Sequence, residues 1–240
     1  YESSAASDVY KRQNLVCRSL EKLKSHKSDF GIMCDVALDP YTDHGHDGLL
    51  SDEGKILNDE TNGVLVKQSI LLAEHGADII APSDMMDGRI GMIRDELEKN
   101  KFVDTLILSY AAKYSSSMYA PFRDAVGSSK NLKTDKKTYQ MNILNSDEAI
   151  REASMDIAEG ADMIMVKPGI SYLDIIYRIK NELKYPTFAY QVSGEYSLIK
   201  FGSQQGIIKE ETMVIEQLSS FKRAGADAII TYYLSLIHIS

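Results

Sequence analysis

AEGADMIMVKP, at residues 158–168, is the stretch that decides the fold. Its glycine, Gly160, follows a helical pattern and can take the left-handed conformation that closes a helix. An Ala-Asp pair comes next, and then a short apolar run, Met163–Val166. A run without polar alternation is typical of a parallel strand that is covered on both faces. The stretch therefore predicts a helix, a tight turn and a buried strand.

Two further stretches repeat this design. AEHGADIIAP lies at residues 73–82 and RAGADAIITYY at residues 223–233, each with a glycine before Ala-Asp and an apolar run. Three such repeats predict a chain in which helices alternate with parallel strands. The other predicted strands are Phe30–Leu38, Asp104–Tyr110 and Thr187–Val192, and the clearest helix is Ser146–Glu159, which Asn145 or Ser146 can cap.

The predicted fold class is α/β, an incomplete (β/α)8 TIM barrel. Polar clusters follow most of the strands, which favours a barrel over the alternative, an open doubly wound sheet. Six of the eight strands are recognised, so we expect the first strands and the last helix to be missing. We expect one catalytic domain at residues 14–233. Residues 1–13 and 234–240 show no docking pattern and are expected to be extraneous flanks or, alternatively, frayed termini.

The composition suits one large domain and argues against two classes of binding partner. The chain has 240 residues, 44% of them hydrophobic, and a formal net charge of −8. No block of Lys and Arg stands out, so neither nucleic acid nor an anionic membrane is an expected partner. No apolar run is long enough to span a bilayer. The two cysteines, Cys17 and Cys34, are expected to be small buried hydrophobes rather than metal ligands.

Two lysines carry the chemistry. Lys167 and Lys113 each stand at or just past the end of a short apolar run. Burial and a second nearby ammonium both disfavour the charged amine, so we expect a lowered pKa for each lysine. A free amine can form a Schiff base with a carbonyl substrate. The alternative is a lysine whose stem is buried and whose charge reaches solvent.

Six motifs at the strand ends resemble the porphobilinogen synthase (5-aminolevulinate dehydratase) family, in the order of that family. They are PYTDHGHDG (40–48), APSDMMDGR (81–89), a lysine upstream of APFRDA (120–125), MVKPG (165–169), VSGE (192–195) and ITYY (230–233). The resemblance runs from about Asn14 to Tyr233. It implies a hydro-lyase of heme and tetrapyrrole biosynthesis that condenses two 5-aminolevulinate molecules into porphobilinogen with loss of water. It also implies an N-terminal arm, which we expect to be absent from this sequence.

The resemblance assigns roles residue by residue. Lys167 would bind the first substrate and Lys113 the second, each as a Schiff base. The other implied residues are Ser193 and Tyr232 for the first carboxylate, Arg123, Lys136 and Gln140 for the second, Tyr119 for substrate binding, and Asp35, Ser83 and Asp84 for proton transfer. Arg123, Lys136 and Gln140 lie on a predicted lid, residues 115–140, and Lys137 is an alternative to Lys136. Asp84 and Ser83 have a second interpretation, as a helix N-cap.

The metal also follows from the resemblance. Zinc-dependent relatives have three cysteines where this chain has Ala37, Asp39 and Asp47, which makes it the aspartate-type, plant-like variant. Carboxylates suit Mg²⁺, so Asp39 and Asp47 are candidate ligands, and Glu152 matches an allosteric Mg²⁺ position. His44 and His46 are expected to have structural roles. The resemblance further implies a homo-octamer and a plastid or apicoplast-like location, with the cytoplasm as the alternative.

Two other readings remain open. Another Schiff-base barrel, such as a class I aldolase, would need one lysine and one substrate per site. A non-catalytic binding protein or fragment would need neither lysine. The number of substrates and of reacting lysines separates these three readings.

Overall fold

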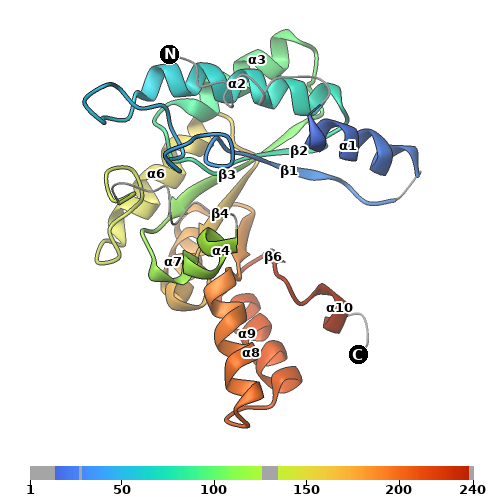
Figure 1. Cartoon of the computed structure of the whole chain (residues 1–240), viewed down its shortest axis with the longest axis vertical. Coiled ribbons are helices and arrows are strands. Elements are labelled where there is room, and N and C mark those ends of the chain that lie inside the picture. Colours follow the sequence, from blue (N-terminus) through green and yellow to red (C-terminus); the bar gives the residue numbers. More distant parts are fainter. Residues whose placement is uncertain (1–13, 27–28, 126–134, 238–240) are drawn as a thin grey trace. The chain divides into compact units, whose positions relative to one another are not determined.

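The computed structural model describes residues 14–26, 29–125 and 135–237. It is an α/β chain in which helices and strands alternate (Figure 1). The elements in the first half are α1 (Leu15–Ser25), β1 (Met33–Val36), α2 (Asn58–Glu74), β2 (Ile79–Pro82), α3 (Arg89–Lys99), β3 (Leu106–Lys113), the 3-10 turn η2 (Ser117–Tyr119) and α4 (Ala120–Ala125). Those in the second half are α6 (Asp147–Ala158), β4 (Met163–Lys167), η3 (Ile170–Tyr172), α7 (Leu173–Arg178) with a π-helical turn (Ile179–Leu183), β5 (Thr187–Tyr190), α8 (Ser193–Gln204), α9 (Glu210–Ala224), β6 (Ala228–Ile230) and α10 (Leu234–Ile237).

The strand order confirms the barrel topology. The six strands are ordered β1-β2-β3-β4-β5-β6, and β1–β2, β2–β3, β4–β5 and β5–β6 all pair in parallel. Sequential order is the order of a (β/α)8 barrel, whereas a doubly wound sheet reverses direction at a switch point. The described strands are therefore six of a barrel's eight.

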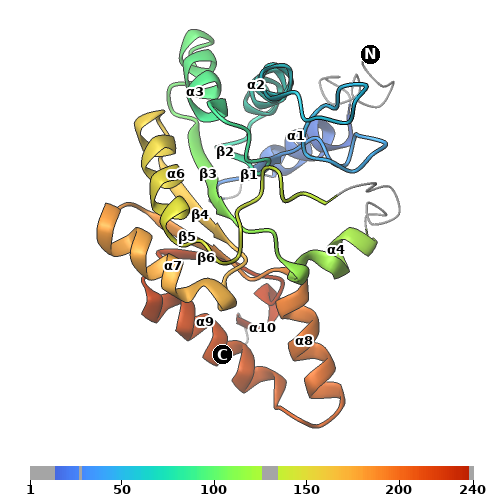
Figure 2. The same ribbon diagram turned by 90° about the vertical axis from the view of Figure 1, so that its left-hand side faces the viewer.

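The chain divides into two compact units. In the described part of the chain, the first consists of residues 14–26, 29–110, 135–139 and 155–162. Within it, α2 and α3 pack side by side (Figure 2), and α2 also packs on β1 and β2. Its core is made of side chains that are fully buried, among them Leu65, Ile80, Ile93, Leu97 and Ile107.

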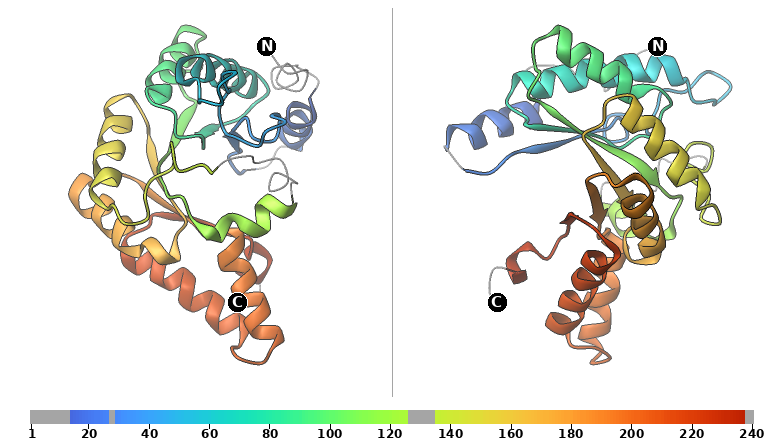
Figure 3. Two further views of the ribbon diagram at one scale, coloured as in Figure 1. Left: turned by 60° about the vertical axis from the view of Figure 1, so that its left-hand side comes forward. Right: turned by 180° about the vertical axis from the view of Figure 1, so that it is seen from behind.

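The described residues of the second unit are 111–125, 140–154 and 163–237. In it, α8 packs against α9 (Figure 1) and α4 lies against α8, green beside orange in Figure 3. The apolar run of β4 is buried as predicted, with Ile164, Met165 and Val166 fully enclosed. Phe221 of α9 is also fully buried. Helices on a parallel strand explain why the strand sequence has no polar alternation.

The three repeated glycines close helices as predicted. Gly76, Gly160 and Gly225 have φ angles of +99°, +105° and +111°, in the region that favours glycine. A second reason is space, because a Cβ at each position would lie about 3 Å from the stem of a basic side chain. Those side chains are Lys24, Arg94 and Lys180.

The aspartate that follows Ala after each of these glycines ties its own strand to an earlier one, and we call this contact an aspartate clamp. Asp78, Asp162 and Asp227 stand before β2, β4 and β6, and each carboxylate accepts the backbone N–H at the start of an earlier strand. The donors are Ile32, Ile107 and Thr187, at 2.7, 2.7 and 2.8 Å. The basic side chain over the glycine pairs with the same carboxylate, for example Lys180 with Asp227 at 2.6 Å. Although burial acts to raise them, the pKa values of Asp78 and Asp227 are lowered by these hydrogen bonds.

Some boundaries differ from the prediction. β1 is shorter than Phe30–Leu38, and β5 ends at Tyr190, before Val192. β3 runs to Lys113 rather than Tyr110, because Ala111 and Ala112 continue the buried run. α6 matches its predicted range to within one residue at each end, and Asn145 caps it by accepting from the N–H groups of Asp147 and Glu148.

The lid and the termini also differ. Residues 117–125 of the predicted lid are helical, since η2 continues into α4. Residues 126–134 and the N-terminal flank 1–13 lie outside the described residues. Residues 234–237 form α10. In the described ranges, no helix is long and apolar enough to cross a membrane. Cys17 and Cys34 are buried and free, as expected, and burial raises the pKa of Cys34 to about 11.

Candidate active site

Lys167 is the last residue of β4 and lies between aromatic rings. Its Nζ is 4.4 Å from the ring centre of Tyr190 on β5 and 5.6 Å from that of Tyr119 on η2. The Tyr119 hydroxyl also donates to the Lys167 carbonyl at 3.0 Å. Ring faces attract an ammonium and restrict where it can lie. The amine is thus positioned at the carboxyl end of its strand, where barrel enzymes keep their chemistry.

Lys113 lies beside Lys167 at the backbone level. It ends β3, is 7% exposed, and its carbonyl accepts from the N–H of Met141. The next residue, Tyr114, donates its N–H to the carbonyl of Lys167 at 2.9 Å. The two predicted Schiff-base lysines therefore stand at the ends of neighbouring segments of the second unit.

Two further predicted residues, Arg123 and Ser193, are connected to Lys167 and Tyr119 through α4. The Arg123 guanidinium lies 5.4 Å from the ring centre of Tyr119, so this ring has cationic groups of both Arg123 and Lys167 near it. The Ser193 hydroxyl, at the start of α8, accepts from the N–H of Phe122 at 3.1 Å. The second unit thus brings together Lys167, Tyr119, Arg123 and Ser193.

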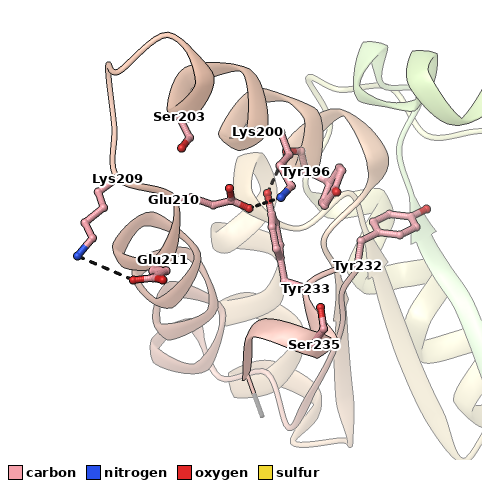
Figure 4. Close-up of a pocket in the computed structure, with 9 residues that line it drawn as sticks. All are labelled: Tyr196, Lys200, Ser203, Lys209, Glu210, Glu211, Tyr232, Tyr233 and Ser235. Atoms are coloured by element: carbon pink, nitrogen blue, oxygen red, sulfur yellow. Dashed lines mark hydrogen bonds and ion pairs between the residues drawn. The ribbon is translucent and has the colours of Figure 1, made fainter. Parts of the chain in front are cut away.

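Tyr232 approaches from β6. Its ring centre is 6.4 Å from that of Tyr190, which contacts Lys167. Tyr232 also lines a cavity of about 440 Å³ between α8, α9 and the residues after β6 (Figure 4). In Figure 4 its hydroxyl points away from the Lys200–Glu210 ion pair on the far wall. The Tyr232 residue is 46% exposed.

Glu195 is a residue of this site that the sequence prediction did not assign. Its buried carboxylate accepts from the N–H groups of Ile170 and Val192, and so ties the segment after Lys167 to the start of α8. Burial raises the pKa of Glu195 to about 7, against the effect of these backbone donors. The signal in the sequence was a glutamate three residues after the predicted strand end in VSGE.

Two glycines allow the close approach around Glu195. A Cβ at Gly194 would lie 2.4 Å from the carbonyl oxygen of Met118, and one at Gly169 would lie 2.5 Å from the ring of Phe221. Both distances are too short for real atoms. MVKPG and VSGE therefore contain glycine because the backbone packs directly against η2 and α9.

Gln140 is 4% exposed, and its side-chain oxygen has no hydrogen-bond partner among the described residues. An unpaired buried oxygen is costly, and a ligand donor can satisfy it. The following residue, Met141, is the one that bonds to Lys113.

The first unit holds two of the predicted metal ligands, Asp39 and Asp47, and a lysine fills the space between them. The Nζ of Lys136 lies 2.8 Å from Asp47 Oδ1 and 3.7 Å from Asp39 Oδ2. Lys136 and Asp47 are both buried. His44 and His46 lie with ring centres 5.6 Å apart, and burial lowers the pKa of His46. Lys136, predicted on the lid, is thus placed on the aspartate pair.

Asp84 and Ser83 are buried at the end of β2. Asp84 Oδ1 accepts from the N–H of Met86, and its Oδ2 lies 3.3 Å from Arg89 Nε. The helix-cap interpretation of Ser83 and Asp84 is wrong, because α3 begins only at Arg89 and its N-cap is Gly88. Burial raises the pKa of Asp84, against the opposing charge of Arg89. Asp35 is exposed on β1 and lines a cavity of about 180 Å³ with Ala37, Tyr41 and Gln68 among others.

The structure offers little support for a divalent ion at the predicted residues. In the described part of the chain, no three His, Cys, Asp or Glu side chains lie in a position to hold a metal ion. Glu152, half-buried on α6, pairs with Arg151 at 3.0 Å. An arginine on the same carboxylate competes with a cation, although Glu152 can still bind one through water.

Comparisons with known proteins agree on one family. The family model described as Delta-aminolevulinic acid dehydratase matches residues 2–238. The Delta-aminolevulinic acid dehydratase of Bradyrhizobium diazoefficiens is 53% identical over 227 residues, which cover 95% of this chain and 64% of the relative. The chloroplastic Delta-aminolevulinic acid dehydratase 1 of Arabidopsis thaliana is 49% identical, over 97% of this chain and 54% of the relative.

A solved structure is similar as well. The delta-aminolevulinic acid dehydratase (porphobilinogen synthase) of Toxoplasma gondii ME49, in complex with the reaction product porphobilinogen, superposes with a TM-score of 0.93 at 51% identity. The match covers 95% of this chain and 65% of that one. The chain therefore spans less than two thirds of the length of these relatives.

Proposed function

Because this chain belongs to the delta-aminolevulinic acid dehydratase family, we propose that it acts as a hydro-lyase that condenses two 5-aminolevulinate molecules to porphobilinogen. Lys167 and Lys113 attack the ketone carbons of the two substrates, and each loses water to form an imine. One imine becomes an enamine whose carbon attacks the imine carbon of the other molecule, and the amino group of that other molecule attacks the imine carbon of the first. Departure of the two lysine amines and loss of a proton complete the pyrrole, so the two waters released are those of imine formation. The porphobilinogen in the Toxoplasma gondii relative supports this product.

The observation that carries the proposal is the placement of the two lysines. They end β3 and β4, and the 2.9 Å bond between the Tyr114 N–H and the Lys167 carbonyl sets these ends side by side. A condensation of two ketones needs two amines close together, whereas a class I aldolase needs one. The neighbourhood of Lys167 also contains groups that suit a carboxylate.

Those groups give the substrate-binding proposal. The Ser193 and Tyr232 hydroxyls bind the carboxylate of the first substrate and Arg123 binds that of the second. Tyr119 lies between Lys167 and Arg123 and orients both. The remaining proposed residues are Gln140 for the second carboxylate and Asp35, Ser83 and Asp84 for proton transfer. Lys136, the other residue that the resemblance implies for the second carboxylate, pairs with Asp47 instead.

We also propose a metal ion, an oligomeric state and a cellular compartment for this protein. Enzymes of this family use metal ions, and Glu152 is the proposed residue for an allosteric Mg²⁺. The implied assembly is a homo-octamer. Chloroplastic relatives, such as that of Arabidopsis thaliana, support a plastid-type location, whereas the bacterial relatives leave the cytoplasm as the alternative.

Borohydride trapping with 5-aminolevulinate tests the proposal. Borohydride reduces each imine to a stable secondary amine, so peptide mass spectrometry identifies the lysines that reacted. We expect adducts on both the Lys167 and the Lys113 peptides. The variant Lys167→Met should lose the adduct on its own peptide and yield no porphobilinogen.

Lys99→Met is the matched control, because Lys99 is an exposed lysine on α3. It should keep both adducts. Trapping on one lysine only, with a single substrate bound, would favour an aldolase-type enzyme. A folded chain without any adduct would contradict the Schiff-base proposal.

A further inference from the structure

The side chain of Lys136 is as buried in the first unit as the side chain of a core residue. Its side chain is 6% exposed, and its ammonium is within 2.8 Å of Asp47, which is 2% exposed. Neighbouring Lys137, by contrast, is 74% exposed and pairs with Asp135 in solvent. Adjacent lysines thus have opposite environments.

The segment that carries Lys136 docks through a second contact. The Tyr139 hydroxyl lies 3.2 Å from Nδ1 of His46 and 3.3 Å from the N–H of Asp47. The segment 135–139 is therefore held against the loop 39–48 at two points. Held in this way, the ammonium of Lys136 stays between the carboxylates of Asp39 and Asp47.

A divalent cation cannot share this place. Mg²⁺ needs oxygen ligands at about 2.0–2.1 Å in an octahedron and keeps several waters. An ammonium at hydrogen-bond distance from Asp47 excludes those waters and repels a second positive charge. Nor do His44 and His46 complete a site, because the described residues contain no converging group of three metal-binding side chains.

We infer that Lys136 is the resident cation of the Asp39–Asp47 pair, and that its ammonium keeps this pair from binding a divalent metal. The aspartates at the positions of the zinc-binding cysteines then form an internal ion pair instead of a metal site. This goes beyond the proposed function, because it holds whichever reaction the lysines catalyse.

Manganese binding, followed by the loss of the free Mn²⁺ signal in electron paramagnetic resonance, tests the inference directly. Neither the wild-type protein nor the matched control Lys137→Met should bind a Mn²⁺ ion that the substitution Asp47→Asn removes. Lys136→Met, which keeps the length of the side chain without its charge, should gain one Mn²⁺ with at least about tenfold tighter binding. The double variant Lys136→Met/Asp47→Asn should lose that ion, which separates it from any ion at Glu152.

Two results of this titration would overturn the inference. One is a wild-type protein that binds Mn²⁺ and loses it in Asp47→Asn. The other is a Lys136→Met variant that gains no ion.

A labelling experiment avoids the risk that Lys136→Met fails to fold. Brief acetylation of the wild-type protein, quantified by peptide mass spectrometry, should modify Lys136 at least about tenfold more slowly than Lys137, since a buried, paired ammonium is neither accessible nor nucleophilic. Excess Mg²⁺ should leave this ratio unchanged, and Asp47→Asn should raise the rate at Lys136. Equal rates, or a rate at Lys136 that rises with Mg²⁺, would refute the inference. Because this readout needs no substrate, its failure is independent of Schiff-base trapping.

Discussion

Replacing Glu195 with glutamine should change how the stability of the protein depends on pH. Burial raises the pKa of this carboxyl from 4.5 to about 7. The folded protein then binds a proton that the unfolded chain has released, so stability falls as pH rises from the unfolded to the folded pKa. The full effect is about 3 kcal/mol, of which about 2.5 kcal/mol develops between pH 5 and pH 8.

Urea unfolding followed by circular dichroism at several pH values between 5 and 8 measures this effect. The amide of Glu195→Gln cannot ionise, so the variant curve should be flatter than the wild-type curve by about 2.5 kcal/mol. The amide has one acceptor oxygen, whereas the carboxylate has two that each accept a backbone N–H. This loss lowers the free energy of unfolding by about 1–3 kcal/mol at every pH and leaves its dependence on pH unchanged.

Glu211→Gln is the control for this experiment, because Glu211 is an exposed glutamate of α9 and its curve should parallel the wild type. Wild-type and Glu195→Gln curves that stay parallel within about 0.5 kcal/mol would refute the reasoning, since that is the usual size of an unrelated surface effect.

Three other substitutions test the described contacts. Asp227→Ala should lower stability by about 1–3 kcal/mol in urea unfolding, because it leaves the buried N–H at the start of β5 without its acceptor; an unchanged midpoint would contradict the clamp. Gly194→Ala should lower stability by about 1–3 kcal/mol because its methyl group would collide with η2, whereas the control Gly63→Ala, with open space around it in α2, should stabilise by about 0.5–1 kcal/mol. Tyr190→Leu removes a ring face worth about 0.5–2 kcal/mol to an ammonium, so borohydride trapping at Lys167 should change in rate by at least about twofold; identical trapping rates would show that the ring does not position the amine.

The sequence predicted the elements whose cause is local. A glycine that ends a helix and an apolar run that forms a strand depend on neighbouring residues, and Gly76, Gly160 and Gly225 all have the expected positive φ. The strand boundaries were less accurate, because the ends of a strand depend on what covers it. Ala111 and Ala112 belong to β3 since they are fully buried, which their small side chains did not signal.

The sequence motifs named candidate site residues but not the contacts that these residues make. The positions of Lys113, Lys167, Arg123 and Ser193 followed from motifs at strand ends, and the second unit places them near one another. One partner of Glu195, the N–H of Ile170, lies 25 residues earlier, and the partner of Lys136 lies farther away still. Lys136 pairs with a residue 89 positions earlier, and no local pattern encodes such a contact.

The aspartate clamps have a consequence for the order of events during synthesis of the chain. Each joins consecutive βα segments, across 46, 55 and 40 residues for Asp78, Asp162 and Asp227. None waits for a partner from the opposite end of the protein. As the chain leaves the ribosome from its N-terminus, each clamp can close once its own aspartate has emerged. Assembly can then proceed strand by strand: the Asp78 clamp can close before Lys113 and Lys167 have been added, and the Asp162 clamp before Lys167 has.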